Sequence, residues 1–211
     1  MPLIRAVLFD YGQVLSGPPD PLAWGRMQTT LGAMDPDFHD AYWRHRQNYD
    51  LGVLDGRAYW RAIAADVRRP LTATQFNELL DADVDLWTQP NQPMINWAHS
   101  LQSAGTPTAI LSNMPDAMEP GILRRFPWLA QFTHHTFSHR LRIAKPDERI
   151  YRHAVSALAV RPEETLFIDD RAENVEAARR IGIQSIQYLS HEKFLRDLES
   201  RCFIGLLQIR P

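Results

Sequence analysis

The sequence predicts an α/β fold, in which a doubly wound parallel sheet is interrupted by an inserted all-helical unit. Three observations carry this prediction. Short apolar runs end abruptly at polar residues, as buried parallel strands do. Helical periodicity alternates with such runs in the later part of the chain, and near its start continues without a strand over about 70 residues. A chain of 211 residues is long enough for one substantial domain that carries one such insert.

The composition is that of a globular protein. With 45% hydrophobic, 10% aromatic and 23% charged residues, the chain is not disordered, collagen-like or coiled-coil. The chain has 23 Lys and Arg residues and 25 Asp and Glu residues, and so has no excess of basic residues. We therefore expect no nucleic-acid partner that is bound mainly through its phosphates. The single cysteine, Cys202, excludes an intramolecular disulfide and a cysteine zinc cluster. The sequence has neither a secretory pattern at its start nor a long apolar stretch, so we expect a cytoplasmic protein without a membrane partner.

The first predicted strand is the apolar run at residues 6–9, which ends at Asp10. Its short length and the turn-forming Gly12 just beyond it are typical of a buried parallel strand. The segment at residues 16–20, with the sequence SGPPD, then breaks the chain. We therefore expect the first strand to be followed directly by the insert.

The insert is predicted to span residues 17–89, which leaves residues 1–16 and 90–211 for the α/β core. Within it, four segments show the spacing of apolar residues that is typical of amphipathic helices, at 22–31, 38–49, 59–67 and 76–86. No convincing strand pattern separates them.

After residue 93, predicted helices and strands alternate. The helices are expected at 95–103, 117–125, 149–158 and 175–181, and the strands at 108–111, 132–137, 165–168 and 184–188. Such alternation is typical of a doubly wound, Rossmann-like parallel sheet.

Polar side chains follow several of these strands. Asp10 ends the first, Ser112 the second, and Asp169 and Asp170 the fourth, while Lys145 precedes a helix after the third. In open parallel sheets, ligands bind beyond the carboxyl ends of the strands. Three carboxylates gathered there would repel one another unless a cation neutralised them, and oxygen ligands favour Mg²⁺. A remaining carboxylate could act as a nucleophile, with the metal and the lysine stabilising the transferring group.

Four motifs in order give the chain a resemblance to the haloacid dehalogenase-like hydrolase superfamily over essentially its whole length. They are LFDYGQVL at 8–15, ILSN at 110–113, Lys145-Pro146 with Tyr151, and FIDD at 167–170 with Asn174. Each motif alone is weak, but four in order at strand ends or helix starts are specific. The resemblance implies that the helical insert is the cap that closes over the site and selects the substrate.

The resemblance also implies roles for individual residues. Asp10 would be the nucleophile that forms an aspartyl-phosphate, and Lys145 would contact both the nucleophile and the phosphate. Ser112 and Asn113 would bind the phosphoryl group. Asn174 would orient the loop of the fourth motif, and Tyr151 would have a supporting role.

The metal site implied by the resemblance holds Mg²⁺ through the side chains of Asp10 and Asp170. Asp169 would act directly or through water, and the backbone carbonyl of Gly12 would complete the set. Most phosphatases of this family carry a second aspartate at the position of Gly12, where it acts as general acid and base, and a glycine at the position of Gln13. The departure leaves the metal site intact but removes an acid, and general acid–base help is typically worth about 10²–10⁴-fold in rate. We therefore expect a preference for phosphates with good leaving groups.

The predicted function is a Mg²⁺-dependent phosphomonoesterase for a small phosphorylated metabolite. Bacterial sugar-phosphate phosphatases of the glucose-1-phosphate type are similar in lacking the acid, and the phosphatase domain of soluble epoxide hydrolases has a similar fourth motif. One alternative is a haloacid dehalogenase, against which Asp169 and Asp170 argue. The other is a non-catalytic binder of a phosphorylated ligand. The substrate and the oligomeric state stay open.

Two further groups of side chains lie outside these motifs. In the second insert helix, the run Trp43-Arg44-His45-Arg46 and Tyr49 could reach a substrate. Aromatic residues on such helices usually pack in a core, however, and arginines usually face solvent. His134 and His135 are neighbours on a predicted strand and point to opposite faces, so we expect no metal site that includes them and His139.

Overall fold

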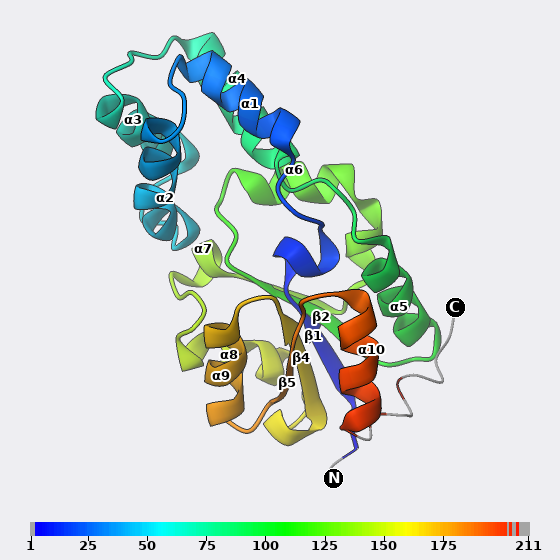
Figure 1. Ribbon diagram of the computed structural model, residues 1–211. Coiled ribbons are helices and arrows are strands. Elements are labelled where there is room, and N and C mark those ends of the chain that lie inside the picture. The colour runs from blue at the N-terminus through cyan, green and yellow to red at the C-terminus, as the bar shows by residue number, and fades with distance from the viewer. Residues whose placement is uncertain (1–2, 202, 204–205, 207–211) are drawn as a thin grey trace.

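The computed structural model describes residues 3–201, 203 and 206, and confirms the predicted fold class (Figure 1). All strands of its sheet run parallel, in the order β3-β2-β1-β4-β5. The strands are β1 (Ala6–Phe9), β2 (Thr108–Ser112), β3 (His134–Phe137), β4 (Thr165–Asp169) and β5 (Gln184–Gln187). The first strand of the chain therefore lies in the centre of the sheet.

The third strand begins two residues later than the predicted range of 132–137. Phe132 instead closes the short helical turn Pro127–Gln131, and its ring packs edge-on against Phe9 with the ring centroids 5.8 Å apart. Phe132 is apolar because it packs in the hydrophobic core, not because it belongs to the strand. The prediction counted it as part of the strand and therefore began the strand too early.

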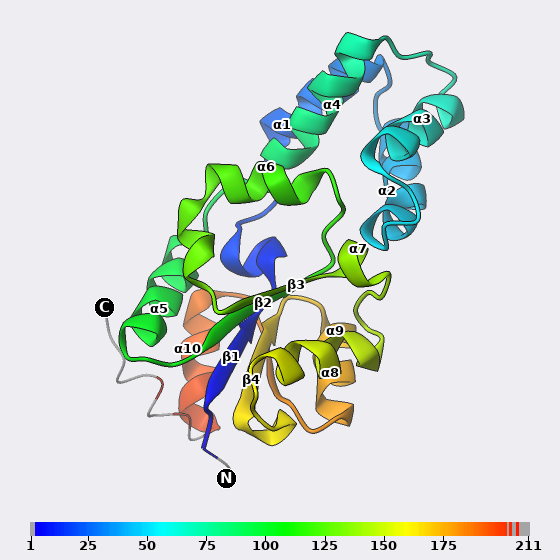
Figure 2. The ribbon, with the colours of Figure 1, turned by 180° about the vertical axis from the view of Figure 1, so that it is seen from behind.

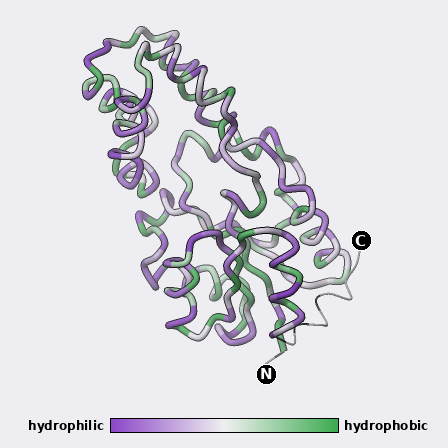
Figure 3. The backbone as a smooth tube through the Cα atoms, in the orientation of Figure 1, coloured by the Kyte–Doolittle hydropathy of each residue, from purple (hydrophilic) through white to green (hydrophobic). Residues whose placement is uncertain are grey.

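Helices cover both faces of the sheet (Figures 1 and 2). On one face lie α5 (Gln92–Ser103), α6 (Met118–Arg125) and α10 (His191–Ser200); on the other lie α8 (Glu148–Ala157) and α9 (Ala172–Arg180). Along β1, Val7 and Phe9 pack in the first core and Ala6 and Leu8 in the second. This double burial explains the continuous apolar runs, visible as green segments in Figure 3. The sequence pattern did not predict α10.

The residues from 17 to 89 contain four long helices and no strand. They are α1 (Pro21–Leu31), α2 (Asp37–Asp50), α3 (Gly56–Asp66) and α4 (Ala73–Asp85). In both ribbon views α1 lies beside α4 and α2 beside α3, away from the sheet (Figures 1 and 2). These helices share a hydrophobic core of their own, with Tyr42, Tyr59 and Trp60 fully buried in it. The two chain segments that join this unit to the sheet are bridged at Ser16 and Pro90.

The helical unit also packs closely against the rest of the molecule near α6 and near residues 138–139. Gly121 in α6 packs so closely on α4 that a Cβ atom there would lie 2.7 Å from the Val84 side chain. At the end of α2, Gly52 has a left-handed φ of +68°, and a Cβ atom there would lie 2.9 Å from the carbonyl oxygen of His139. The Ser138 hydroxyl, at the start of α7 (Ser138–Leu141), donates to the carbonyl oxygen of Asp50 at 2.5 Å. Close backbone contact therefore fixes the carboxyl end of α2 over the sheet edge.

The carboxyl-terminal segment is only partly described. Cys202 lies outside the described residues, whereas Phe203 and Leu206 pack in the core that contains α5 and α10. These two side chains therefore pack on the core of the same chain. Among the described residues, no helix has the length and apolarity that crossing a membrane requires.

Candidate active site

The carboxyl ends of three adjacent strands bring the predicted polar residues together. Because β1 lies between β2 and β4, with Phe9 in register with Ile110 and Ile168, Asp10 follows directly beside the ends of both neighbours. The Asp10 amide also donates to the carbonyl oxygen of Ile168 at 2.9 Å. Hydrogen bonding of the sheet therefore fixes the backbone from which the Asp10 side chain projects.

Lys145 joins the first and the fourth motif. Its Nζ lies 2.8 Å from Oδ1 of Asp10 and 2.7 Å from Oδ2 of Asp169, and its side chain is only 2% exposed. Burial by itself would lower the pKa of Lys145, but the two carboxylates more than offset this and raise it. The lysine is therefore a buried group at the centre of the site, and its surroundings favour the charged ammonium form.

The Asp10 carboxylate has one engaged and one open oxygen. Oδ1 accepts from the Tyr11 amide at 2.7 Å and from Lys145, whereas Oδ2 has no partner among the described residues and the residue borders a cavity. Burial raises the pKa of Asp10 to about 7; Lys145 opposes this shift, and Asp169 and Asp170 add to it. Without a further cation the site holds more negative charge than it can stabilise.

The two acids of the fourth motif differ in their surroundings. Asp169 is fully buried, and its Oδ1 accepts from the Arg171 amide and from Nδ2 of Asn174, each at 2.9 Å. With Lys145 on Oδ2, both of its oxygens have protein donors. Asp170 is half-buried and accepts only from Nε2 of Gln13, at 2.9 Å, among side chains. Burial and the charge of Asp169 raise the pKa of Asp170.

The three carboxylates suit a metal ion. Asp10, Asp169 and Asp170 each offer an oxygen within 4.8 Å of the others, and within the described part of the chain they are the one such group of three acidic, histidine or cysteine side chains. Three carboxylates against one ammonium group leave an excess of two negative charges, which matches a divalent cation that prefers oxygen ligands. His134, His135 and His139 are not among the groups of side chains that could hold a metal within the described part of the chain.

Ser112 and Asn113, at the end of β2, also border the cavity. Ser112 is buried, and its hydroxyl has no hydrogen-bond partner among the described residues. The Asn113 side chain is paired with the backbone of Lys145: it accepts from the Lys145 amide at 2.8 Å and donates to the Lys145 carbonyl oxygen at 3.0 Å. Asn113 thus holds the lysine in position.

The turn after β1 shows how Gly12 and Gln13 are accommodated. Gln13 adopts a left-handed φ of 56°, the conformation that favours the glycine expected there, and its amide group contacts Asp170. A Cβ atom at Gly12 would lie 3.7 Å from Trp87, an ordinary contact distance. The absence of an acid at this position is therefore not forced by a lack of space for a Cβ atom.

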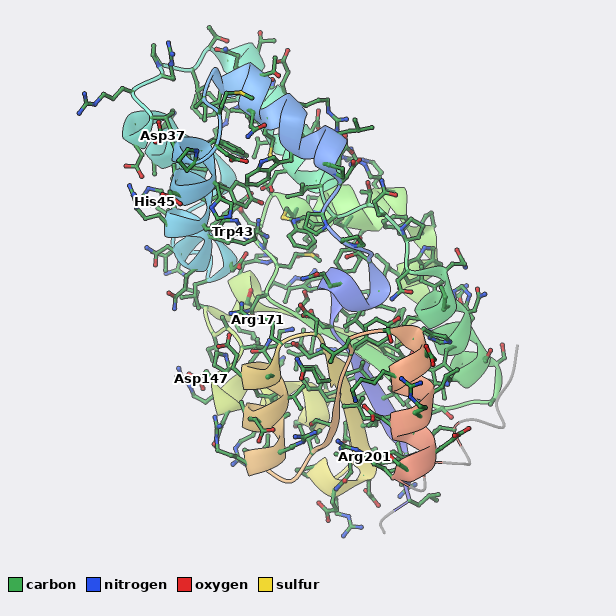
Figure 4. All side chains as sticks on the ribbon, in the orientation of Figure 1. Asp37, Trp43, His45, Asp147, Arg171 and Arg201 are labelled. Carbon is green, nitrogen blue, oxygen red and sulfur yellow. The ribbon has the colours of Figure 1, made fainter. Side chains whose placement is uncertain are left out.

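The cavity over the strand ends has a volume of about 160 Å³, comparable to about five water molecules. Core residues form its floor, and Trp43, Arg46 and Asp50 of α2 form part of its roof. A second cavity of about 670 Å³ lies next to it and shares these three side chains. Trp43 and Arg171 border both cavities, the first from the helical unit and the second from the core (Figure 4). A phosphoryl group fits the inner cavity, and the outer one offers room for an organic portion.

Two charged side chains of the helical unit differ from the expectation: Arg46 was expected to face solvent, and Asp50 was not singled out. Arg46 is buried rather than facing solvent, and with Asp50 it borders the cavity, whereas Tyr49 packs in the helical core as expected. One signal was available, because Phe38, Tyr42, Arg46 and Tyr49 follow one another at helical spacing and so share one buried face.

Known proteins resemble this chain in sequence and in structure. It is 26% identical to bifunctional epoxide hydrolase 2 of Sus scrofa over 97% of its own length and 40% of that protein's. It is 32% identical to (S)-2-haloacid dehalogenase 1 of a Pseudomonas strain over 53% of this chain and 48% of that one. It is 28% identical to sesquiterpene phosphatase astK of Aspergillus oryzae over 85% of this chain and 87% of that one. The chain thus spans less than half the length of the first two relatives.

Two solved structures share the fold. One is the HAD family enzyme bt-2542 of Bacteroides thetaiotaomicron, with a TM-score of 0.72, 18% identity and coverage of 92% of this chain and 98% of that one. The same enzyme has been solved with magnesium and inorganic phosphate. The other is L-2-haloacid dehalogenase of Xanthobacter autotrophicus, with a TM-score of 0.65, 21% identity and coverage of 94% and 83%. Because a family model described as haloacid dehalogenase-like hydrolase also matches residues 4–182, the chain belongs to the haloacid dehalogenase-like hydrolases.

Proposed function

We propose that this hydrolase is a Mg²⁺-dependent phosphomonoesterase that acts on a small phosphorylated metabolite, such as a sugar phosphate, through an aspartyl-phosphate. The observation that carries the proposal is the open Oδ2 of Asp10, which borders a phosphate-sized cavity beside a buried ammonium group and two further carboxylates.

In this mechanism Oδ2 of Asp10 attacks the phosphorus atom in line with the leaving oxygen. Lys145 neutralises charge on the transferring phosphoryl oxygens while it holds Asp10 through Oδ1. The free hydroxyl of Ser112 donates to the same phosphoryl oxygens, and Asn113 keeps Lys145 in place. Water then attacks the phosphorus atom and releases phosphate, which restores the Asp10 carboxylate.

Asp10, Asp170 and the carbonyl of Gly12 would hold Mg²⁺, and Asp169 would support it directly or through water. The ion would neutralise the excess negative charge of the three carboxylates and polarise the phosphoryl group. The open position of Asp170, compared with the fully engaged oxygens of Asp169, supports Asp170 as the main ligand of the fourth motif. We further propose that residues 17–89 are the substrate-selecting cap of a core made of 1–16 and 90–211.

The phosphatase among the relatives supports this proposal, as does a fold neighbour that binds magnesium and inorganic phosphate. The dehalogenases among them keep a second function open, in which Asp10 would displace halide from a haloacid. That reaction needs no metal, whereas three converging carboxylates favour a bound cation. A non-catalytic binder of a phosphorylated ligand is the third possibility.

The deciding experiment is steady-state hydrolysis of p-nitrophenyl phosphate with Mg²⁺ and with EDTA, by the wild type and by Asp10→Asn. We expect turnover that needs Mg²⁺ and falls by more than about 10³-fold in the variant, since the nucleophile is lost. Halide release from 2-chloropropionate, measured in parallel, would indicate the dehalogenase instead. Folded wild-type protein that binds phosphate but releases neither product would indicate the binder.

A further inference from the structure

A second buried cluster of charged groups lies in the roof of the active-site cavity. The Arg46 guanidinium donates through Nε to Oδ1 of Asp50 at 2.8 Å, and its Nη1 lies 3.6 Å from Oδ1 of Asp83 on α4. The Tyr42 hydroxyl links the two sides, because it accepts from Nη1 of Arg46 and donates to Asp83, both at 2.6 Å. Two carboxylates thus share one guanidinium group.

The two carboxylates differ in their access to the cavity. Asp83 has a side chain that is 1% exposed and lines neither cavity. The side chain of Asp50 is 16% exposed, and the residue borders both the inner and the outer cavity. Its Oδ2 has no partner among the described residues, since Arg46 contacts Oδ1. Asp50 therefore lies at the junction where a phosphoryl group in the inner cavity would meet the organic portion in the outer one.

The surroundings of Asp50 raise the affinity of this carboxylate for a proton. Burial raises the pKa of Asp50 to about 6; Arg46 opposes the shift, Asp83 adds to it, and Lys145 across the cavity lowers it slightly. On the packed helix α7, His139 and Arg140 are both paired with Glu119. Two carboxylates against one guanidinium group leave one negative charge in excess, and a proton on Asp50 removes it.

We propose that Asp50 is the general acid of this hydrolase and supplies from the cap the proton that Gly12 cannot supply. The proposal rests on the proposed phosphatase function. As Oδ2 of Asp10 bonds to phosphorus and the bond from phosphorus to the ester oxygen breaks, the proton of Asp50 moves to that oxygen, and an alcohol leaves. The resulting Asp50 carboxylate then takes a proton from the water that hydrolyses the aspartyl-phosphate. The contact of Ser138 with the Asp50 carbonyl holds the acid over the site.

The test compares Asp50→Asn with Asp83→Asn, which disturbs the same arginine but lines neither cavity. For each protein, kcat/KM is measured with p-nitrophenyl phosphate and with phenyl phosphate, because this constant covers the reaction only up to departure of the leaving group. Phenol is the poorer leaving group and needs the proton more. We expect Asp50→Asn to lose about 10²–10³-fold with phenyl phosphate and less than about tenfold with p-nitrophenyl phosphate. Asp83→Asn leaves the Asp50 carboxyl in place, so it should change the ratio of the two constants far less than Asp50→Asn does.

Two measurements keep the test decisive if Asp50→Asn folds poorly. In the wild type, kcat/KM for phenyl phosphate should fall as the pH rises above about 6, with a smaller fall for p-nitrophenyl phosphate. The double variant Asp50→Asn with Gly12→Asp should regain activity toward phenyl phosphate, since the Cβ atom fits at residue 12.

Equal losses with both substrates in Asp50→Asn, or a leaving-group dependence that stays as in the wild type, would overturn the role of Asp50 alone. Wild-type protein without any Mg²⁺-dependent and Asp10-dependent turnover of p-nitrophenyl phosphate would overturn the proposed function as well.

Discussion

The sheet edge and the helical roof each hold a buried charged cluster, and the two are built differently. At the sheet edge, Lys145 pairs with Asp10 and Asp169. In the roof, Arg46 pairs with Asp50 and Asp83. In each cluster one basic side chain contacts two carboxylates. Only the cluster at the sheet edge could be predicted from the sequence.

The difference lies in what fixes each cluster. The residues of the first project from the ends of hydrogen-bonded strands, so the sheet topology alone brings Asp10 and Asp169 together. Those of the second come from one turn of α2 and from α4, and they meet only because two helical faces pack together. Backbone topology can be predicted from a pattern of apolar runs, whereas the packing of side chains between two helices cannot.

Removing the cation of each cluster should give the largest contrast. We expect Lys145→Met to lower kcat for p-nitrophenyl phosphate by about 10³-fold, because phosphoryl charge loses its fixed partner. Arg46→Met should lower it by less than about tenfold. Both variants leave buried carboxylates unpaired, so urea denaturation should show a loss of about 3 kcal/mol in the free energy of unfolding for each. An equally inactive Arg46→Met would mean that the two clusters share one function in the reaction.

The two clusters should differ in how Mg²⁺ changes the pH dependence of protein stability. The pKa of Asp10 is raised in the folded protein, so its stabilising contribution is complete below about pH 4 and is lost as the pH rises through about 7. Mg²⁺ needs ionised ligands and should reverse this loss. At a concentration 100-fold above its Kd, it should raise the melting temperature by about 5–10 °C at pH 8 and by much less at pH 5.

The roof cluster should respond to pH but not to the metal. The pKa of Asp50 is raised to about 6, so its contribution falls between about pH 4 and 6 whether or not Mg²⁺ is present. Thermal melts of Asp50→Asn should therefore lack this part of the pH dependence and keep the response to Mg²⁺. If Asp50→Asn lost both this pH dependence and the response to Mg²⁺, the protonation of the two clusters would be coupled.

The smallest expected effect concerns Gln13. Gln13→Gly and Gln13→Ala both remove the hydrogen bond to Asp170, and each should weaken Mg²⁺ binding, measured by calorimetry, by about tenfold. Only the glycine relieves the left-handed backbone, so Gln13→Gly should be about 1 kcal/mol more stable than Gln13→Ala. Equal stabilities would show that the φ of 56° carries no strain.

The same contrast explains how much the sequence could predict. The three central strands were predicted because burial on both faces of the sheet leaves an apolar run for each. The edge strands β3 and β5 contribute only Phe137 and Ile186 to these cores, and they were predicted from their place in the alternation of helices and strands. The third was drawn too long, since Phe132 packs in the core without joining the strand. The helix α10 was missed, and only Phe194 and Leu198 of its residues are buried. Asp50 and Asp83 were missed because acidic residues on helices usually face solvent, and only the packing of α2, α4 and α7 shows otherwise.

The central position of β1 has a consequence for synthesis of the protein. Ribosomes make this strand first, but its two neighbours in the sheet, β2 and β4, begin at residues 108 and 165. Until about residue 169 has emerged, β1 has an open edge whose residues are all buried in the finished protein. Asp10 also lies more than 130 residues before Lys145 and Asp169 in the chain, so we expect this cluster to become ordered late in folding. A chain whose synthesis stops before β4 would therefore expose an unpaired, apolar strand edge that is prone to aggregation. We expect catalytic activity only after the whole sheet has formed.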